Sequence, residues 1–308
     1  MDATPQEIIR IQDLIFHEDK EVIEQGCALL EALTSDPTLV LKVFGVSTSA
    51  STLEACWSDE WPTSTALYLH LSLFALLVEL EVSWACSVSE LNLNINPRNL
   101  VGKKTFKPTV FPSRFARLTS ITDLSLQNHD LSEIPNELSQ WTQLRRLDLE
   151  DNYIRELPDW IGGLTQLTEL SLLANEIHTL PSALATLEQL TQLELSWNPV
   201  WVLEDGTRAL SLSDEQWAHA TVRQQVCQMT SLRFLKVSAG GYGDFPADWS
   251  KVVCLEELHV STMHLSGEPT WLQTIPNLRR LHFWVYEDSE EVYAQIRLLL
   301  PDCDFLNF

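Results

Sequence analysis

The sequence has few basic residues. Among its 308 residues, 20 are Lys or Arg and 43 are Asp or Glu, which gives a formal net charge of −23. A charge of this sign repels phosphate groups, so we expect neither nucleic-acid binding nor binding to an anionic membrane. It favours basic partners, if the chain binds any. Acidic residues outnumber basic ones by 15 to 3 up to Pro97 and by 28 to 17 from Arg98 onward, so the first third is the more acidic part.

Long apolar runs and paired cysteines are also lacking. The most apolar stretch, residues 65–78, contains His70. It is shorter than the roughly 20 residues that span a bilayer, so it predicts a buried helix. The N-terminus has no basic lead followed by an apolar segment, and we expect no secretory signal. The six cysteines show no C-x-x-C spacing, which favours reduced thiols and a cytoplasmic protein.

Familiar catalytic motifs do not occur in the sequence. It contains no G-x-S-x-G, no glycine-rich phosphate loop and no H-E-x-x-H. Cys227 and Cys254 fall on parts of the chain that are expected to face the core, so neither is predicted to be a nucleophile. We therefore expect a protein that is not an enzyme and uses no cofactor. An enzyme with its site in the N-terminal domain remains an alternative.

The chain does contain a repeat of 23 residues. Between Ile121 and Pro199 successive rows superimpose without a gap, with apolar residues at row positions 1, 4, 6, 11, 14, 18 and 21. Position 9 is Asn in three rows and position 15 is Pro in three rows. These residues are Asn152, Asn175, Asn198, Pro135, Pro158 and Pro181. The pattern L-x-x-L-x-L-x-x-N-x-L resembles the leucine-rich repeat family, over roughly Ser89 to Phe308.

The resemblance implies an α/β solenoid with a parallel inner sheet and the shape of an arc. Positions 3 to 7 alternate apolar and polar residues, as a strand with one buried face does. Asn at position 9 suits a side chain that caps turning backbone, and Pro at position 15 suits a chain that leaves the sheet. Rows with Pro at position 15 resemble the subtype of bacterial and intracellular eukaryotic signalling proteins. Strands are expected to centre on residues 124–126, 147–149, 170–172, 193–195, 235–237, 258–260 and 281–283.

Both ends of the array, and its middle, depart from the period. An insertion at about 201–220 interrupts the fourth row; a loop is expected to about Ser211, followed by a helix that Ser213 caps. A closing helix is predicted from Asp288 to Leu300, followed by a last strand within residues 302–308. Residues 89–96 are expected to form the first strand. The repeat domain is thus assigned to residues 89–308.

Residues 1–88 carry no 23-residue period and predict a small helical domain. Thr4 followed by Pro5 is an N-cap and N1 proline, ahead of an apolar stripe at helical spacing. Further helices are expected at about 19–33, 39–44 and 65–82, although the alternating leucines of the last one would also fit a strand. Because the end of a repeat array leaves core exposed, this domain is predicted to cap the solenoid.

A partner can reach positions 3, 5, 7 and 8 of each row. Neighbouring rows are about 4.8 Å apart, so charged residues at these positions are expected to pair, as in Lys236 with Glu194 and Arg280 with Glu257. Arg146 is expected to lie between two carboxylates, and Asp148 is expected to be unpaired. The candidate partner-binding residues are Trp197, Phe234, His259, His282, Trp284, Asp148 and Glu194.

Two alternatives stand beside this assignment. Trp197 packs under the insertion in one of them, and Trp284 packs against the last helix in the other. The neighbouring His259 and His282 suggest a metal pair, but no Cys, Asp or third His lies at ligand spacing beside them, so no metal is predicted. A pH-sensitive contact is favoured instead, because adjacent imidazoles disfavour joint protonation.

The resemblance implies protein recognition through the concave sheet and implies no reaction. We therefore expect a monomeric, cytoplasmic interaction module of the kind that acts as a signalling scaffold, with a protein partner that the acidic charge favours to be basic. A regulatory or inhibitory subunit that masks a basic partner is the second reading of the same features.

Overall fold

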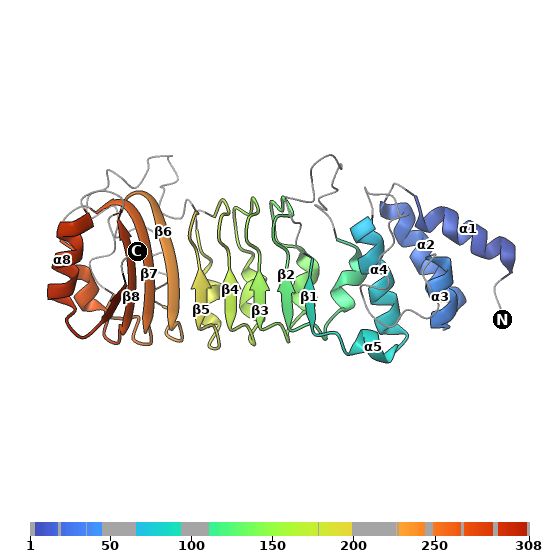
Figure 1. Ribbon diagram of the computed structural model, residues 1–308. Coiled ribbons are helices and arrows are strands. Elements are labelled where there is room, and N and C mark those ends of the chain that lie inside the picture. Colours follow the sequence, from blue (N-terminus) through green and yellow to red (C-terminus); the bar gives the residue numbers. More distant parts are fainter. Residues whose placement is uncertain are drawn as a thin grey trace. The chain divides into compact units, whose positions relative to one another are not determined.

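Figure 1 shows the computed structural model. Its chain falls into two compact units. Unit 1 comprises Met1–Asp123 and Pro135–Trp141, and unit 2 comprises Leu124–Ile134 and Thr142–Phe308. The residues that the structure describes are 4–17, 20–34, 36–44, 66–93, 111–177, 179–198, 226, 228–243, 249–265, 268–285 and 289–306. The insertion at about 201–220 and the helix predicted from Ser213 lie outside them.

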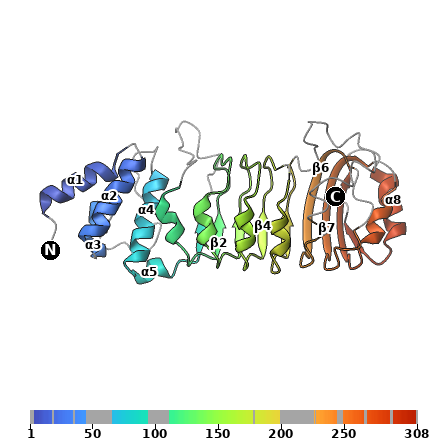
Figure 2. The ribbon, with the colours of Figure 1, turned by 180° about the vertical axis from the view of Figure 1, so that it is seen from behind.

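Unit 1 contains the helices predicted for the N-terminal region (Figure 2). They are α1 (Pro5–Ile15), α2 (Lys20–Leu33), α3 (Pro37–Val43), α4 (Ala66–Glu79) and the unpredicted short α5 (Ser83–Cys86), followed by strand β1 (Glu90–Asn92) and the 3-10 helix η3 (Ser113–Arg117). Thr4 caps α1 through a capping box with Glu7, and Asp36 caps α3 by accepting from Thr38 N at 2.9 Å. The cap at Thr4 therefore starts α1 where predicted, whereas the cap at Asp36 starts α3 two residues before its predicted start at 39.

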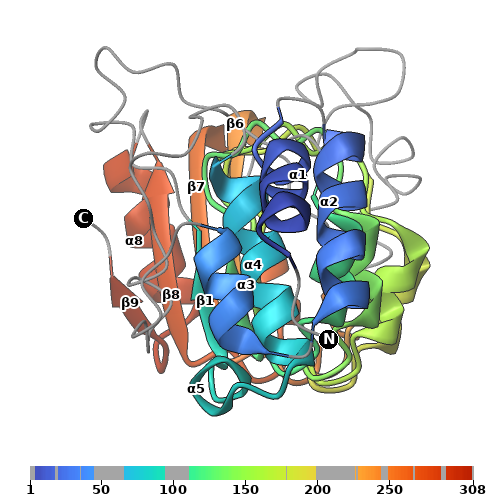
Figure 3. The same ribbon diagram turned by 90° about the vertical axis from the view of Figure 1, so that its right-hand side faces the viewer.

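Helix α4 is the central element of unit 1. The five consecutive residues 73–77 are all buried, which a surface helix with one apolar stripe does not show. The helix prediction is confirmed, and the alternative of a strand is wrong. Helices α1 and α2 lie side by side (Figure 3), and α4 contacts both α2 and η3.

A polar and an aromatic contact hold η3 within unit 1. Arg114, which is only 5% exposed, places Nη2 2.7 Å from Glu31 Oε2 of α2. Trp141 donates its Nε1–H to the Phe115 carbonyl at 3.0 Å, and their rings pack with centroids 4.6 Å apart. Residues 111–117, which precede the first regular row at Ile121, are thus bound to α2 and to Trp141.

The strands follow one another in chain order in one sheet. They are β1, β2 (Asp123–Ser125), β3 (Arg146–Asp148), β4 (Glu169–Ser171), β5 (Gln192–Glu194), β6 (Phe234–Gly243), β7 (Glu257–Leu265), β8 (Arg280–Val285) and β9 (Asp304–Leu306). From β3 to β9 every neighbouring pair is parallel, and the same row positions face each other, as Leu147 and Leu170 do. The predicted parallel sheet is confirmed. Each of the strands β2 to β8 begins one residue before the three-residue segment on which it was predicted to centre.

The row prolines and asparagines act as the sequence predicts. Pro135, Pro158 and Pro181 directly precede the 3-10 helices η4 (Asn136–Gln140), η5 (Asp159–Gly163) and η6 (Ser182–Thr186). Pro112 and Pro269 precede η3 and η8 (Thr270–Thr274) in the same way. Asn175 is buried: its Oδ1 accepts from Ile154 N at 3.1 Å, and its Nδ2 donates to Leu149 O at 2.9 Å. Each asparagine therefore joins backbone of adjacent rows.

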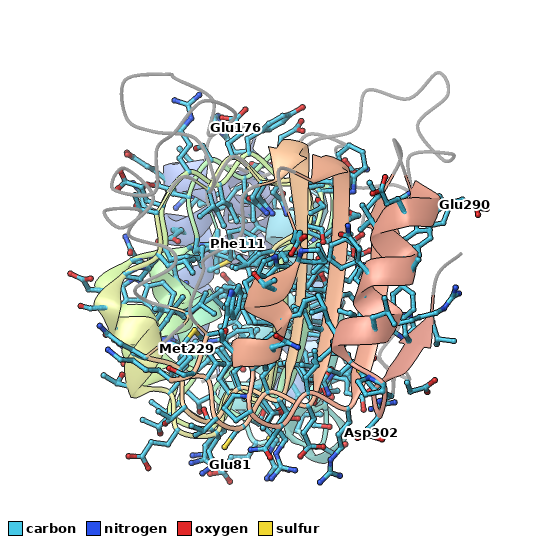
Figure 4. All side chains as sticks on the ribbon, turned by 90° about the vertical axis from the view of Figure 1, so that its left-hand side faces the viewer. Glu81, Phe111, Glu176, Met229, Glu290 and Asp302 are labelled. Carbon is cyan, nitrogen blue, oxygen red and sulfur yellow. The ribbon has the colours of Figure 1, made fainter. Side chains whose placement is uncertain are left out.

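A helix and a strand end the chain of unit 2, as predicted. Helix α8 (Ser289–Leu299) precedes β9, and Tyr293 ties it to β8 by accepting from Val285 N at 3.1 Å. Figure 4 shows the side chains at this end, with Glu290 at the start of α8 and Asp302 in the turn that leads into β9. Among the described residues, no helix is long and apolar enough to cross a membrane.

Candidate functional site

The outward face of strands β5 to β8 carries most of the candidate residues. Along β8, half-buried or exposed residues alternate with the buried Leu281 and Phe283. The strand register places Lys236, His259 and His282 on one rung of the sheet, one per strand. We call this surface the β5–β8 face, and it consists of Glu194, Trp197, Phe234, Lys236, Glu257, His259, Arg280, His282 and Trp284.

Three rings stand in a row on the β5–β8 face. Phe234 meets His259 edge to face, with ring centroids 4.9 Å apart, and His259 stacks on His282 at 3.9 Å. The sequence predicted the histidine neighbours, and the parallel register brings Phe234 to them. Trp284, two residues beyond His282 on the same strand, is 37% exposed.

Trp197 has the most exposed aromatic side chain of the face. It is 70% exposed and its backbone has a φ of 58°, in the left-handed region that few non-glycine residues adopt. Its N–H donates to the Ser238 hydroxyl of β6 at 2.7 Å. The turn after β5 is therefore held against β6 while the indole projects outward.

A pocket of about 340 Å³ opens beside these rings. Its lining is Ser196, Lys236, Val237, His259, Val260, Ser261, His282, Phe283 and Trp284. A smaller hollow of about 140 Å³ lies over β3 to β6 and is lined in part by Asp148, Glu194 and Phe234. The outward surface of the sheet thus has an aromatic part, within the β5–β8 face, and an acidic part toward β3, with Phe234 between them.

The predicted ion pairs are present. Lys236 Nζ lies 2.7 Å from Glu194 Oε2, and Arg280 Nη2 lies 2.5 Å from Glu257 Oε2. Arg146 Nε lies 3.1 Å from Glu169 Oε2. These pairs neutralise part of the face, each at the modest gain of an exposed pair.

Asp148 is not unpaired, so that expectation is wrong. It accepts hydrogen bonds from Ser125 Oγ at 3.1 Å, from Gln127 Nε2 at 2.6 Å and from Glu150 N at 3.1 Å. Asp148 was expected to be unpaired because the sequence offers it no neighbouring cation other than those assigned to other carboxylates. The neutral donors at positions 5 and 7 of the preceding row satisfy it instead.

Glu150 belongs to the acidic part of the sheet surface, and sequence reasoning did not assign it to the site. Burial raises its pKa, and the negative charges of Asp148 and Glu194 raise it further. Gln127 bridges Asp148 and Glu150, since its Nε2 also lies 3.2 Å from Glu150 Oε2. Position 7 of the second row is the sequence signal that identifies Glu150.

Glu257 is the second residue that sequence reasoning did not assign to the site. Its Oε1 lies 2.7 Å from His259 Nε2 and 3.9 Å from His282 Nε2. Burial lowers the pKa of His282, and the charge of His259 lowers it further. Glu257 was interpreted only as the partner of Arg280, and the search for ligands beside the histidines considered Cys, Asp and His.

The sequence matches a leucine-rich repeat region over residues 69–298. The chain belongs to the leucine-rich repeat family. The match covers about three quarters of the chain, which confirms the resemblance and the solenoid fold. Proteins of this family are generally protein-interaction modules, which is the level of function that membership supports.

Two solved structures of leucine-rich repeat proteins show similarity to this chain, whereas no curated protein matches the sequence. A leucine-rich repeat protein of Leptospira interrogans is 18% identical, over 76% of this chain and 91% of that chain, with a TM-score of 0.34. Internalin C2 of Listeria monocytogenes is 21% identical, over 63% of this chain and 83% of that chain, with a TM-score of 0.38.

Proposed function

We propose that this leucine-rich repeat protein is a non-enzymatic module that binds a protein partner through the β5–β8 face, the surface expected to be concave. The observation that carries the proposal is the 70% exposure of Trp197. An indole in water contributes little to folding, whereas aromatic side chains that become buried in an interface supply much of its binding energy.

The surroundings of Trp197 support an anchored partner. Trp284 and the stacked rings of His259 and His282 border the pocket of about 340 Å³, which has room for apolar groups of a partner. Polar groups at its rim, such as Lys236 and Ser261, provide donors and acceptors around that apolar centre. Interfaces commonly combine an apolar centre with a polar rim.

The acidic part of the sheet surface, which lies toward β3 beside the β5–β8 face, supports a basic partner. Asp148, Glu150 and Glu194 lie close enough that the negative charges of the other two raise the pKa of Glu150. A Lys or Arg of a partner would relieve this repulsion, and the net charge of −23 would attract it from a distance. A regulatory or inhibitory subunit that masks a basic partner would use the same contacts.

The free thiols fit a cytoplasmic location for this interaction. The described cysteines Cys27, Cys86, Cys254 and Cys303 form no disulfide with one another. Burial raises the pKa of Cys27 to about 12, so its thiol stays protonated at neutral pH. Reduced cysteines persist in a reducing compartment. We propose that the chain acts there as a monomer.

A capture experiment with matched variants tests the proposal. The immobilised protein, Trp197→Ala, Trp284→Ala and Tyr153→Ala are exposed to lysate of the native host, and bound proteins are quantified by mass spectrometry. Tyr153 is the control, because it is 52% exposed but lies in the turn after β3, outside the β5–β8 face. Loss of an anchor costs roughly 2 kcal/mol or more, so a specific partner should be depleted about thirtyfold by either Trp change.

The control decides how the capture result is interpreted. A partner that is retained by Tyr153→Ala and lost by both Trp variants supports binding at this face. Equal recovery on all four proteins, with unchanged circular dichroism, would place the partner elsewhere on the chain.

A further inference from the structure

We propose that Glu257, His259 and His282 bind one Zn²⁺ ion on the outward face of β7 and β8. Among the residues that the structure describes, they form the one group of three His, Cys, Asp or Glu side chains whose ligand atoms lie close enough for a shared metal, all within 4.8 Å of one another. The inference stands on this geometry and does not depend on a protein partner.

The strand backbones place the three side chains together. His259 and His282 occupy one rung of the parallel pair β7–β8, and Glu257 precedes His259 by two residues, so all three point to the same face. Beneath them Leu258 and Leu281 are fully buried, which fixes the strands that carry the ligands. Sites built on strands hold their geometry better than sites on loops.

The separations of the donor atoms bracket the spacing that zinc requires. Glu257 Oε1 is 2.7 Å from His259 Nε2 and 3.9 Å from His282 Nε2. Tetrahedral Zn²⁺ with ligands at about 2.0–2.2 Å places donors roughly 3.3 Å apart. The two imidazole rings are stacked with centroids 3.9 Å apart, so a shared ion requires both rings to turn out of this stack until their nitrogen lone pairs converge, a change that χ1 and χ2 of histidine allow.

The chemistry of the three donors favours zinc over calcium or magnesium. Two imidazoles and a carboxylate are nitrogen-rich ligands of the kind that bind Zn²⁺, whereas Ca²⁺ and Mg²⁺ prefer sets made only of oxygen. The ligand form of histidine is the neutral imidazole, which offers a nitrogen lone pair to the ion. Three protein ligands leave a fourth position for water, on the side of the pocket that His259 and His282 line.

Neighbouring cations are occupied in ways that leave the ligands available. Arg280 binds Oε2 of Glu257, so Oε1 faces the two histidines, and a second contact of this kind orients a metal-binding carboxylate. Lys236 is paired with Glu194 at 2.7 Å. The three ligand side chains are 15% to 24% exposed, which lets an ion enter while limiting their motion.

Metal titration of the full chain tests the proposal. Zn²⁺ competition with a chromophoric chelator should give one ion per chain with a dissociation constant in the micromolar range or below, and Ca²⁺ should not compete. Even outer-shell changes weaken metal sites by about tenfold to a hundredfold, so His259→Gln and His282→Gln should each weaken binding by at least about tenfold. His17→Gln, an exposed histidine of unit 1, should bind as the unaltered protein does.

Co²⁺ separates this site from binding by cysteines such as the exposed Cys86. The Co²⁺ protein should show the visible absorption of a tetrahedral nitrogen–oxygen site without thiolate charge-transfer bands. This absorption spectrum and the Co²⁺ affinity should both be unchanged in Cys86→Ser. The proposal is overturned if the full chain binds no Zn²⁺, or if the His259→Gln and His282→Gln proteins, folded by circular dichroism, bind it as tightly as the His17→Gln protein.

Discussion

Trp197 and Ser238 are joined by a 2.7 Å hydrogen bond from the Trp197 backbone N–H to the Ser238 hydroxyl, although 41 residues separate them in the chain. The bond connects the turn after β5 with β6. The two residues lie on either side of the insertion in the sequence. Their hydrogen bond therefore holds Trp197, the most exposed aromatic residue of the β5–β8 face, at a fixed place.

Removal of the Ser238 hydroxyl should loosen this turn. Ser238→Ala leaves the Trp197 N–H without its acceptor, so we expect a loss of about 1 kcal/mol in the free energy of unfolding and faster amide exchange at Trp197. Ser261 is the control, because it lies beside Ser238 on β7. Ser261→Ala should leave the exchange rate of Trp197 unchanged, and equal acceleration in both variants would show that the hydrogen bond does not hold the turn.

The buried row asparagines Asn152, Asn175 and Asn198, here called the asparagine ladder, should be essential for the stability of unit 2. Asn175→Leu leaves Ile154 N and the carbonyls of Leu149 and Leu172 without their buried partner. Each buried unsatisfied group costs about 1–3 kcal/mol, so we expect the free energy of unfolding to fall by about 3 kcal/mol or more.

Asn277 provides the comparison for the ladder. It is exposed and makes a single hydrogen bond to Val253 O, at 2.7 Å. Asn277→Leu should cost less than about 1 kcal/mol in urea unfolding. Similar losses in the two variants would mean that the ladder contributes no more than a surface amide does.

Acid should weaken unit 1 through Glu31. Burial by itself raises the pKa of this carboxyl, but the hydrogen bonds and positive charges of Arg114 and Arg117 outweigh burial and lower the pKa below its ordinary value of 4.5. A lowered folded-state pKa gives stability that is present above the ordinary value and is lost as the pH falls through the lowered one.

Unfolding of unit 1 between about pH 6 and about pH 3 measures this contribution. Glu31→Gln should be less stable than the unaltered protein at the higher pH, and the difference should shrink as the pH falls. Asp13→Asn, at an exposed residue of α1 in unit 1, should show no such convergence. A Glu31→Gln difference that stays constant with pH would contradict the assigned role.

The N-terminal helices should be needed for the solubility of the repeats. In unit 1, Phe111 and Phe115 are buried, and Arg114 meets Glu31 of α2. A fragment of residues 98–308 loses the helices that cover this side, so we expect it to bind a hydrophobic dye and to aggregate. If the fragment stays monomeric and unfolds at an unchanged temperature, residues 1–88 are an independent domain rather than a cap.

The period of the sequence by itself determined the sheet, its parallel register and the places of the buried asparagines. Each row repeats the same local pattern, so Leu147 must face Leu170 if the rows stack at all. For the same reason Asn175 must bind the turn of its own row as Asn152 binds the turn one row earlier. Local signals likewise determined where α1 begins, because Thr4, Pro5 and Glu7 act within one turn of the helix.

Only the tertiary structure decided the partners of Asp148 and the second contact of Glu257. Asp148 is satisfied by Ser125 and Gln127, and Glu257 turns one oxygen to Arg280 and the other to His259. The row period places these residues on one surface, but rotamers decide which of several neighbours within reach becomes the partner. Differences in free energy between such rotamers are small and depend on all neighbours together, which is why the period predicted the face and its ion pairs but not the partners of Asp148 or the second contact of Glu257.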